Sequence, residues 1–241
     1  MSVSENPRTV ALESGLRKSV FSEALFGLYR LGALRKLCVS ASLRLEGGNF
    51  HSFTLRRILA DYHGVRVGAY SYGSCMIPGE FPKGVTVGRY ASVAAGVQIF
   101  LRNHPMDRLS THPFFYNKEL GFLTEDSIET GTLTIGHDAW VGASAIFTPS
   151  CREVGLGAVV GAGAVVTKSV PDFAIVAGNP AKLIRYRFDM ETCELIRAGR
   201  WWERSVEECA AHMGDMVTPL GKRPYLHPLL RREGPDQASR G

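Results

Sequence analysis

A period of six residues runs from Val67 to Pro171 and constrains this chain more than any other feature. An apolar residue marks each step, and a small residue recurs four positions later at most steps. The marking residues are Val67, Val87, Val93, Ile99, Ile135, Val141, Phe147, Val154, Val160 and Val166. Such a period is the signature of a parallel β-helix built from hexapeptides, in which three hexapeptides make one triangular coil.

Glycine follows the marking residue in six of these ten steps, at positions 68, 88, 136, 142, 155 and 161. Glycine makes up about 7% of an average chain, so its recurrence in phase is not a product of composition. We expect the glycine and the small residue to let the backbone bend at a corner without a Cβ clash. Coils stack about 4.8 Å apart, and several must stack because one coil cannot bury its own inner face.

The period stops between His104 and Ile135, where 30 residues from 105 to 134 carry no repeat. Loops longer than about 12–15 residues are uncommon in compact domains unless they serve a function or are disordered. The sequence therefore places His104 at a corner where a long loop leaves a rigid coil. The loop mixes aromatic with charged side chains, and we expect its aromatic half to pack over a neighbouring surface.

A helix is predicted before the repeats, from Gly15 to Cys38, because apolar residues recur there at steps of three and four. Basic residues flank this stripe. The helix either covers the terminal coil or rests on a membrane surface, which are the two roles we consider for residues 15–38. Residues 40–59 favour an irregular or strand-like lead-in to the first coil.

The residues after Pro171 are expected to leave the repeat. An extended strand and a turn at Gly178-Asn179-Pro180 are followed by a predicted helix over 188–213, and 218–241 favour a draped or disordered tail. The chain is therefore predicted as one domain of three parts: 1–62, the β-helix over 63–178 with its protruding loop, and 179–241.

Charge and cysteine content narrow the class of protein. The formal net charge is +5 and the pI about 9.0, which suits an anionic ligand such as coenzyme A or a nucleotide sugar. The five cysteines show no metal-ligand spacing and are odd in number, so we expect free thiols in a reducing compartment. A cytoplasmic protein is expected, because neither a signal-peptide pattern nor a transmembrane run is found. No nucleic-acid motif or dense basic tract points to a nucleic-acid partner.

Several segments resemble the hexapeptide acyltransferases. They are the repeats, Asn103-His104-Pro105-Met106-Asp107, Thr111-His112-Pro113-Phe114, Ala177-Gly178-Asn179-Pro180-Ala181-Lys182-Leu183-Ile184-Arg185 and the pair Trp201-Trp202. The chain is most similar to the xenobiotic acetyltransferases, which modify chloramphenicol and streptogramins, and to their polysaccharide O-acetyltransferase relatives. The resemblance covers roughly residues 45–210. It implies a mainly β fold, a left-handed parallel β-helix forming a triangular prism, with an N-terminal helix, a protruding loop and a C-terminal helix.

The resemblance implies transfer of an acetyl group from acetyl-CoA to a hydroxyl of a saccharide: a glycan, a lipid-linked sugar or a nucleotide sugar. His104 matches the catalytic histidine of the family, and a histidine that titrates near neutrality suits removal of a hydroxyl proton. This chemistry requires no metal. The expected coenzyme A contacts are Gly142, Ala143, Gly161, Ala162, Thr167, Lys168, Lys182 and Arg185. The expected acceptor contacts are Tyr70, Tyr72, Phe81, Asn103, Asp107 and His112.

A homotrimer is also implied, with coenzyme A in a groove between subunits, and closed cyclic symmetry is the common arrangement of such oligomers. Asn103 and Asp107 are candidates to orient the imidazole of His104. His137 occupies a usually polar position of a hexapeptide and is expected to face solvent.

Other functions stay open on the sequence. The acceptor is alternatively an antibiotic of chloramphenicol or streptogramin type, or an amino sugar that is acetylated on nitrogen. A non-catalytic β-helix that binds saccharides would keep the fold without the chemistry. A metal-dependent lyase on the same prism would need three converging histidines, and the third coil offers only His137.

Overall fold

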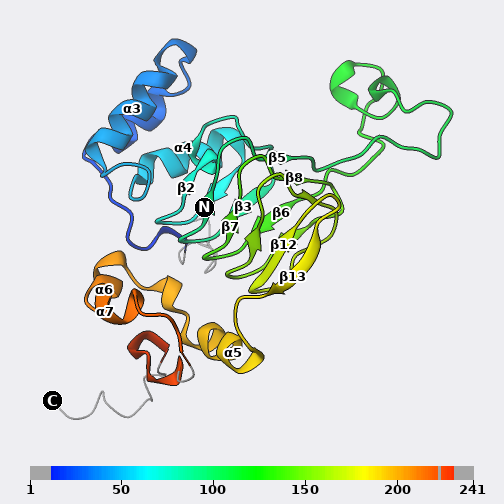
Figure 1. The fold of residues 1–241 in the computed structure, drawn as a ribbon. Coiled ribbons are helices and arrows are strands. Elements are labelled where there is room, and N and C mark those ends of the chain that lie inside the picture. Colours follow the sequence, from blue (N-terminus) through cyan, green and yellow to red (C-terminus); the bar gives the residue numbers. More distant parts are fainter. Residues whose placement is uncertain (1–11, 222–223, 231–241) are drawn as a thin grey trace, which may run out of the picture.

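The computed structural model describes residues 12–221 and 224–230. Its centre is a stack of short strands in three sheets (Figure 1). The sheets have the strand orders β1-β3-β6-β9, β13-β12-β10-β7-β4-β2 and β11-β8-β5. From β3 to β11, successive strands enter the three sheets in rotation, so each turn of the chain contributes one strand to each sheet. These strands pair in parallel, as the sequence predicts.

The strands are only two to five residues long. The first sheet holds β1 (Arg66–Val67), β3 (Val85–Val87), β6 (Leu133–Ile135) and β9 (Glu153–Val154). The second holds β2 (Tyr72–Gly73), β4 (Ser92–Val93), β7 (Trp140–Val141), β10 (Val159–Val160), β12 (Ala174–Ala177) and β13 (Lys182–Tyr186). The third holds β5 (Gln98–Ile99), β8 (Ile146–Phe147) and β11 (Val165–Val166). Only the pair β12–β13 among these strands is antiparallel.

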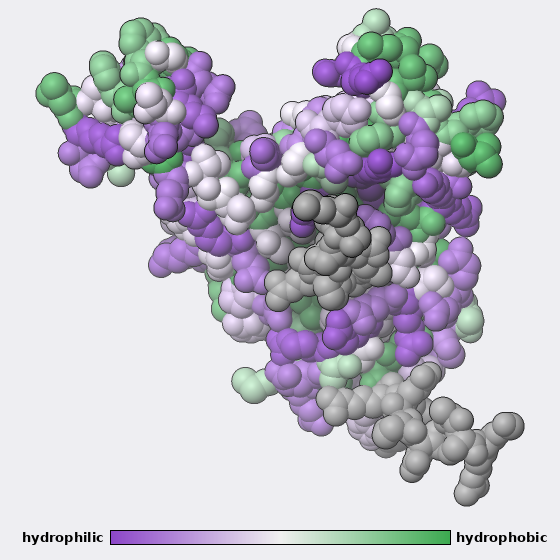
Figure 2. Space-filling view, turned by 180° about the vertical axis from the view of Figure 1, so that it is seen from behind, coloured by the Kyte–Doolittle hydropathy of each residue, from purple (hydrophilic) through white to green (hydrophobic). Residues whose placement is uncertain are grey.

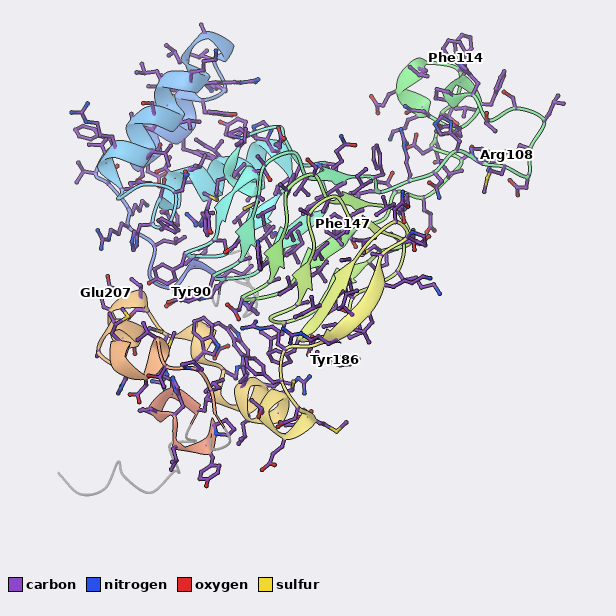
Figure 3. The ribbon with its side chains drawn as sticks, viewed as in Figure 1. Tyr90, Arg108, Phe114, Phe147, Tyr186 and Glu207 are labelled. Atoms are coloured by element: carbon purple, nitrogen blue, oxygen red, sulfur yellow. The ribbon has the colours of Figure 1, made fainter. Side chains whose placement is uncertain are left out.

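The six-residue period decides which side chains stack inside. Val87 pairs with Ile135, and Ile135 pairs with Val154, so marking residues of successive coils lie next to one another. Phe147, which Figure 3 labels within the coil, pairs with the marking residues of the coils on either side and is fully buried. The predicted register is confirmed, and the stacked marking residues form a column of aliphatic side chains with this one aromatic ring.

The glycines that follow the marking residues have a different role from the predicted one. Gly136 does not adopt the left-handed backbone, and a Cβ added there would lie 2.7 Å from the carbonyl carbon of Gly155 on the next coil. These glycines therefore permit close stacking of coils. The left-handed turn comes two residues later, for example at Asp138 (φ 55°) and Tyr90 (φ 58°).

The N-terminal region is more helical and more broken than the sequence predicts. Its helices are α2 (Ser22–Leu28), the 3-10 turn η1 (Gly32–Leu34), α3 (Arg35–Leu45) and α4 (Phe53–His63). The single helix predicted over 15–38 is wrong, because Leu31 is extended (ψ 107°) between α2 and α3. The predicted lead-in over 40–59 is also wrong. The Ser52 side chain accepts the amide N–H of Leu55 to begin α4, and Gly64 (φ 66°) ends it, so a complete pair of capping signals brackets this helix.

The long loop contains the 3-10 turns η3 (Pro113–Phe115) and η4 (Lys118–Leu120). It projects far from the sheets in Figure 1, and we call residues 102–130 the arm. The amide N–H of Gly131 donates to the carbonyl of Leu101 (2.8 Å) and closes its base. Because β6 begins at Leu133, the loop ends two residues earlier than predicted.

The C-terminal region packs beyond β13. It holds α5 (Met190–Gly199), η5 (Trp201–Glu203), α6 (Val206–Ala210), α7 (Met213–Met216), η6 (Pro224–Leu226) and η7 (Pro228–Leu230). The helix predicted over 188–213 is interrupted, because Arg200 takes the left-handed backbone (φ 47°) at the end of α5. Within the tail predicted to be draped or disordered, Leu229 and Leu230 are buried. Residues 222–223 and 231–241 of that tail lie outside the described residues.

Buried Arg89 joins the three parts of the chain. Its guanidinium donates to the carbonyls of Ser14, Trp202 (2.7 Å) and Arg204 (3.0 Å), so it ties the N-terminal segment, the sheets and the C-terminal region together. All five cysteines are buried and free. Within residues 12–221 and 224–230, no helix is both long and apolar enough to cross a membrane.

Candidate active site

His104 lies five residues after β5, where the chain leaves the third sheet and enters the arm. Its Nδ1 lies 2.7 Å from the carbonyl oxygen of Thr111, on the other side of the arm's first turn. A carbonyl can only accept a hydrogen bond, so Nδ1 must carry the proton. The neutral imidazole then has its lone pair on Nε2. This exposed side chain is therefore held in the tautomer that a general base requires.

Tyr116 completes the support of His104. Its hydroxyl lies 3.1 Å from Nδ1, and the two rings meet edge-to-face at 5.4 Å. The guanidinium of Arg102 covers the Tyr116 ring at 5.6 Å and pairs with Asp126 at 3.6 Å. At 4% exposure, Tyr116 is the most buried side chain in the arm. The orienting groups are therefore Thr111 and Tyr116, and the contact with His104 is not made by the predicted candidates Asn103 and Asp107.

No pattern in the sequence points to Tyr116, because the arm has no period and the contact joins residues twelve positions apart. Asn103, Asp107 and His112, predicted as acceptor contacts, are all exposed near the start of the arm. His112 uses its Nδ1 to accept the amide N–H of Phe114 at 3.3 Å. That side chain thus helps to shape the turn at η3.

The aromatic residues predicted as acceptor contacts are distributed differently. Tyr70 is 5% exposed, and its ring stacks near Tyr90 at 4.7 Å. Phe81 is also 5% exposed and belongs to the main core. Only Tyr72, on the outer side of β2, is exposed. The prediction for Tyr70 and Phe81 is corrected accordingly, since packing inside the chain hides both rings from an acceptor.

The residues predicted to contact coenzyme A lie along two edges of the third sheet. At one edge, Ala143 and Ala162 are exposed on neighbouring coils, where a Cβ on Gly142 would lie 2.5 Å from the amide nitrogen of Ala162. Gly161 continues this row toward β13, because its added Cβ would meet Ala177 at 2.9 Å. The result is a narrow strip of small side chains in which backbone lies close to the surface.

Cationic side chains extend the row of small residues. Lys182 pairs with Ala177 across β12 and β13, and both Lys182 and Arg185 are exposed. Thr167 and Lys168 follow β11 at the opposite edge, on the side from which the arm leaves after β5. Because β5, β8 and β11 are neighbours, Lys168 lies two coils, or roughly 10 Å, along the stack from the start of the arm.

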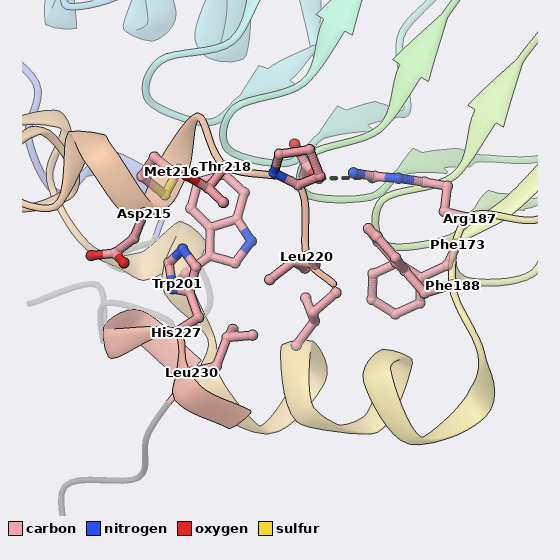
Figure 4. Close-up of a pocket in the computed structure, with 13 residues that line it drawn as sticks. Phe173, Arg187, Phe188, Trp201, Asp215, Met216, Thr218, Leu220, His227 and Leu230 are labelled. Carbon is pink, nitrogen blue, oxygen red and sulfur yellow. Dashed lines mark hydrogen bonds and ion pairs between the residues drawn. The ribbon is translucent and has the colours of Figure 1, made fainter. Parts of the chain in front are cut away.

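A separate cavity of about 500 Å³ lies between the sheets and the C-terminal region (Figure 4). Phe173, Phe188 and Trp201 supply its aromatic walls. Arg187 and Asp138 form an ion pair of 2.9 Å in its wall, and burial raises the pKa of Asp138 although Arg187 opposes the shift. None of the predicted site residues lines this cavity, so it is not the site around His104.

His137 is not the solvent-facing residue that the sequence predicts. It stacks on Trp202 with 5.6 Å between ring centroids, and its Nδ1 accepts the amide N–H of Arg89 at 3.0 Å. Burial, with a smaller contribution from the Arg89 cation, lowers its pKa to about 4. Among the residues that the structure describes, no group of three or more histidine, cysteine or acidic side chains is placed to hold a metal ion.

Comparison with known proteins identifies the family. No family model matches the chain. The chloramphenicol acetyltransferase of Agrobacterium fabrum is 35% identical over 166 residues, which cover 65% of this chain and 77% of the relative. The chloramphenicol acetyltransferase of Klebsiella aerogenes is 34% identical, with 62% and 80% covered. A probable macrolide acetyltransferase of Lysinibacillus sphaericus is 29% identical, with 61% and 84% covered.

Among solved structures, the N-acyltransferase AntD from Bacillus cereus shares 20% identity over 55% of this chain and 68% of that chain. The TM-score of this comparison is 0.41. The sequence relatives are similar over more than three quarters of their own length, and the sequence motifs point to the same group. The chain therefore belongs to the hexapeptide-repeat acyltransferases of the xenobiotic branch, the family of the chloramphenicol acetyltransferases, and is an acyltransferase.

Proposed function

We propose that this chain transfers the acetyl group of acetyl-CoA to a hydroxyl of a small acceptor of the chloramphenicol type. The observation that carries the proposal is the contact between His104 and the Thr111 carbonyl, which leaves Nε2 of an exposed histidine as the proton acceptor. The names of the sequence relatives favour this acceptor class over the saccharide that the motifs first indicated.

In the proposed reaction, Nε2 of His104 removes the proton of the acceptor hydroxyl as its oxygen attacks the thioester carbonyl. The bond between the carbonyl carbon and sulfur then breaks, and Nε2–H returns the proton to the sulfur of coenzyme A. Throughout, Nδ1–H stays on the Thr111 carbonyl, which also stabilises the imidazolium formed between the two transfers. Tyr116 keeps the ring in position.

Coenzyme A is proposed to lie along the strip of Ala143 and Ala162, with Lys182 and Arg185 near its phosphates. Thr167 and Lys168, at the opposite edge of this sheet, are proposed to line its pantetheine chain in the groove between two subunits. A thin pantetheine chain suits a surface without large side chains, and cations suit the phosphate end. This strip lies at one edge of the third sheet, and the arm begins at the opposite edge of the same sheet. We therefore propose a homotrimer in which the arm of one subunit reaches the strip of another, and in which the three sheets form a left-handed triangular prism.

The arm supports the trimer proposal. Phe115 is 59% and Phe122 is 71% exposed in the single chain, and Figure 3 shows Phe114 far out on the arm. Aromatic side chains gathered on a projecting segment favour contact with another surface. A solution mass near three times 26.4 kDa is expected for the full chain, and a monomeric mass would contradict the proposal.

The test of the function is thiol release from acetyl-CoA by the wild type and by His104→Ala. Chloramphenicol, saccharides and nucleotide sugars are offered separately. His212→Ala, in the C-terminal region, is the matched control for loss of a histidine. We expect release with chloramphenicol, a loss of about 100-fold to 10,000-fold in His104→Ala and full activity in the control.

Thiol release only in the presence of a saccharide would show that the acceptor is a saccharide and not a molecule of the chloramphenicol type. An N-acetylated amino sugar as the sole product would move the chain to nitrogen transfer. Failure of the wild type to bind acetyl-CoA would overturn the enzymatic proposal as a whole.

A further inference from the structure

The helical hairpin formed by α2 and α3 projects beyond the sheets at the end opposite to β13 (Figure 1). The inner side of the hairpin is packed against the fold, because Tyr29 and Cys38 form a small buried core with Ile58 of α4. Buried Glu46 fixes the base of the hairpin to α4. Its carboxylate accepts hydrogen bonds from the hydroxyl of Ser22 (2.6 Å) in α2 and from the hydroxyls of Ser52 and Thr54 at the start of α4. The hairpin is thus a fixed part of the fold.

The end of this hairpin carries a second, outer set of side chains that are exposed, although the Arg35 guanidinium also donates to the carbonyl of Tyr29 (3.3 Å) and lies over the Tyr29 ring. Three leucines are exposed there, and three cations are interspersed with them. We call this surface the hairpin tip: Leu28 (43% exposed), Leu31 (49%), Leu37 (64%), Arg30, Arg35 and Lys36. Figure 2, seen from behind, shows apolar and polar side chains side by side on the projecting lobes.

Charge is concentrated at the same place. Residues 28–37 contain three basic side chains and no acidic one, while the whole chain has a formal net charge of only +5. Single exposed leucines are ordinary on protein surfaces. Three leucines together with three cations on one protruding turn are the pattern by which proteins bind an anionic bilayer surface, where the leucines enter the acyl boundary and the cations meet lipid headgroups.

We propose that the hairpin tip is a docking site for a lipid bilayer that contains anionic lipids. A second copy of this chain that presented the same tip would bring like charges together, which opposes such a contact. Nucleic acid would pair with the cations but would leave the three leucines in water. Among these surfaces, only a lipid bilayer satisfies both sets of side chains.

The test is co-sedimentation of the full-length protein with vesicles. Vesicles of phosphatidylcholine alone are compared with vesicles that also contain phosphatidylserine, at low and physiological salt. The wild type is expected to bind the anionic vesicles and to be released by salt. The triple variant Arg30→Gln, Arg35→Gln and Lys36→Gln is expected to lose on the order of 100-fold in affinity, since each cation near such a surface contributes roughly fivefold.

A matched control removes three exposed cations elsewhere on the fold, by Arg66→Gln, Lys83→Gln and Arg152→Gln. It has the same net charge as the tip variant and is expected to bind vesicles nearly as the wild type does. A third variant, Leu28→Ser, Leu31→Ser and Leu37→Ser, is expected to retain binding at low salt and lose it at physiological salt. Circular dichroism checks that each variant is folded.

Equal binding by the tip variant and its control would overturn the proposal, because binding would then follow net charge alone. No binding of the wild type to anionic vesicles would also overturn it. If the tip variants instead change the solution mass of the protein, the tip is a contact between copies of the chain. These readouts do not use acetyl transfer, so they stand or fall independently of the proposed function.

Discussion

The half-buried His137 makes the stability of this protein depend on pH in a predictable direction. Its Nδ1 accepts the Arg89 amide N–H, so the neutral ring must carry its proton on Nε2. A second proton on Nδ1 would displace that hydrogen bond and place a positive charge near the buried Arg89 guanidinium. Burial and this neighbouring cation lower the pKa of His137 to about 4, against 6.5 for an ordinary histidine.

The size of the effect follows from proton linkage. Between pH 6.5 and 4, the unfolded chain binds a proton at this position and the folded chain does not, so stability falls as the pH falls. For each pH unit by which the pH falls inside this window, the free energy of unfolding decreases by about 1.4 kcal/mol. From pH 7.5 to pH 5.0, His137 alone should therefore lower the free energy of unfolding by about 2 kcal/mol, and by roughly 3 kcal/mol at pH 4.

The assay is urea denaturation followed by fluorescence at pH 7.5, 6.5, 5.5 and 5.0, for the wild type and His137→Asn. Asparagine can place its Oδ1 near the position of Nδ1, but it does not titrate. We expect the variant to be less stable than the wild type at pH 7.5, since stacking on Trp202 is lost, and to lose about 2 kcal/mol less between pH 7.5 and 5.0.

The exposed His112 provides a matched control, and His112→Asn should retain the pH dependence of the wild type. Titration of every other group is shared by the three proteins and cancels in the comparison. If wild type and His137→Asn lost the same free energy of unfolding over this pH range, the neutral state of His137 in the folded protein would be refuted.

Three further predictions concern the site and the coil. Tyr116→Phe keeps the ring beside His104 but removes the hydroxyl near Nδ1, so kcat should fall about 3-fold to 10-fold in the thiol-release assay. An unchanged kcat would show that the Tyr116 hydroxyl does not help to position His104. Gly136→Ala should lower the melting temperature by about 2–10 °C in calorimetry, because the methyl group meets the next coil, whereas Gly214→Ala meets nothing within 4 Å and should melt near the wild type. Lys168→Ala should raise the KM for acetyl-CoA about 3-fold to 10-fold with kcat retained, and an unaltered KM would exclude Lys168 from the coenzyme A site.

The sequence was most informative where one physical constraint repeats. Because coils of equal length stack, the pairing of Val87 with Ile135 follows from counting in sixes. Counting does not show why glycine follows the marking residue. The close approach of Gly136 to Gly155 is a distance between coils, and the corner turn lies instead at residues such as Asp138.

Prediction failed where contacts join unlike elements. The hydrophobic pattern of 40–59 favours a lead-in, although Ser52 and Gly64 mark both ends of a helix that packs under the first coil. The sequence predicts Tyr70 as part of a binding surface, yet in the structure this ring is covered by the N-terminal segment and by Tyr90. Neither contact leaves a period in the sequence, because each is made once between segments of different structure.

The contrast between His104 and His137 shows what decides the role of a histidine in this fold. Both follow a strand of the coil, His104 five residues after the marking residue Ile99 and His137 two residues after Ile135. At His104, Nδ1 faces the carbonyl of Thr111, so it must donate, and Nε2 is the basic atom of an exposed ring. At His137, Nδ1 faces the amide N–H of Arg89, so it must accept, and the protonated Nε2 belongs to a ring stacked on Trp202. The backbone group that faces Nδ1 sets the tautomer of each ring, while burial and the nearby Arg89 cation make His137 resist a second proton.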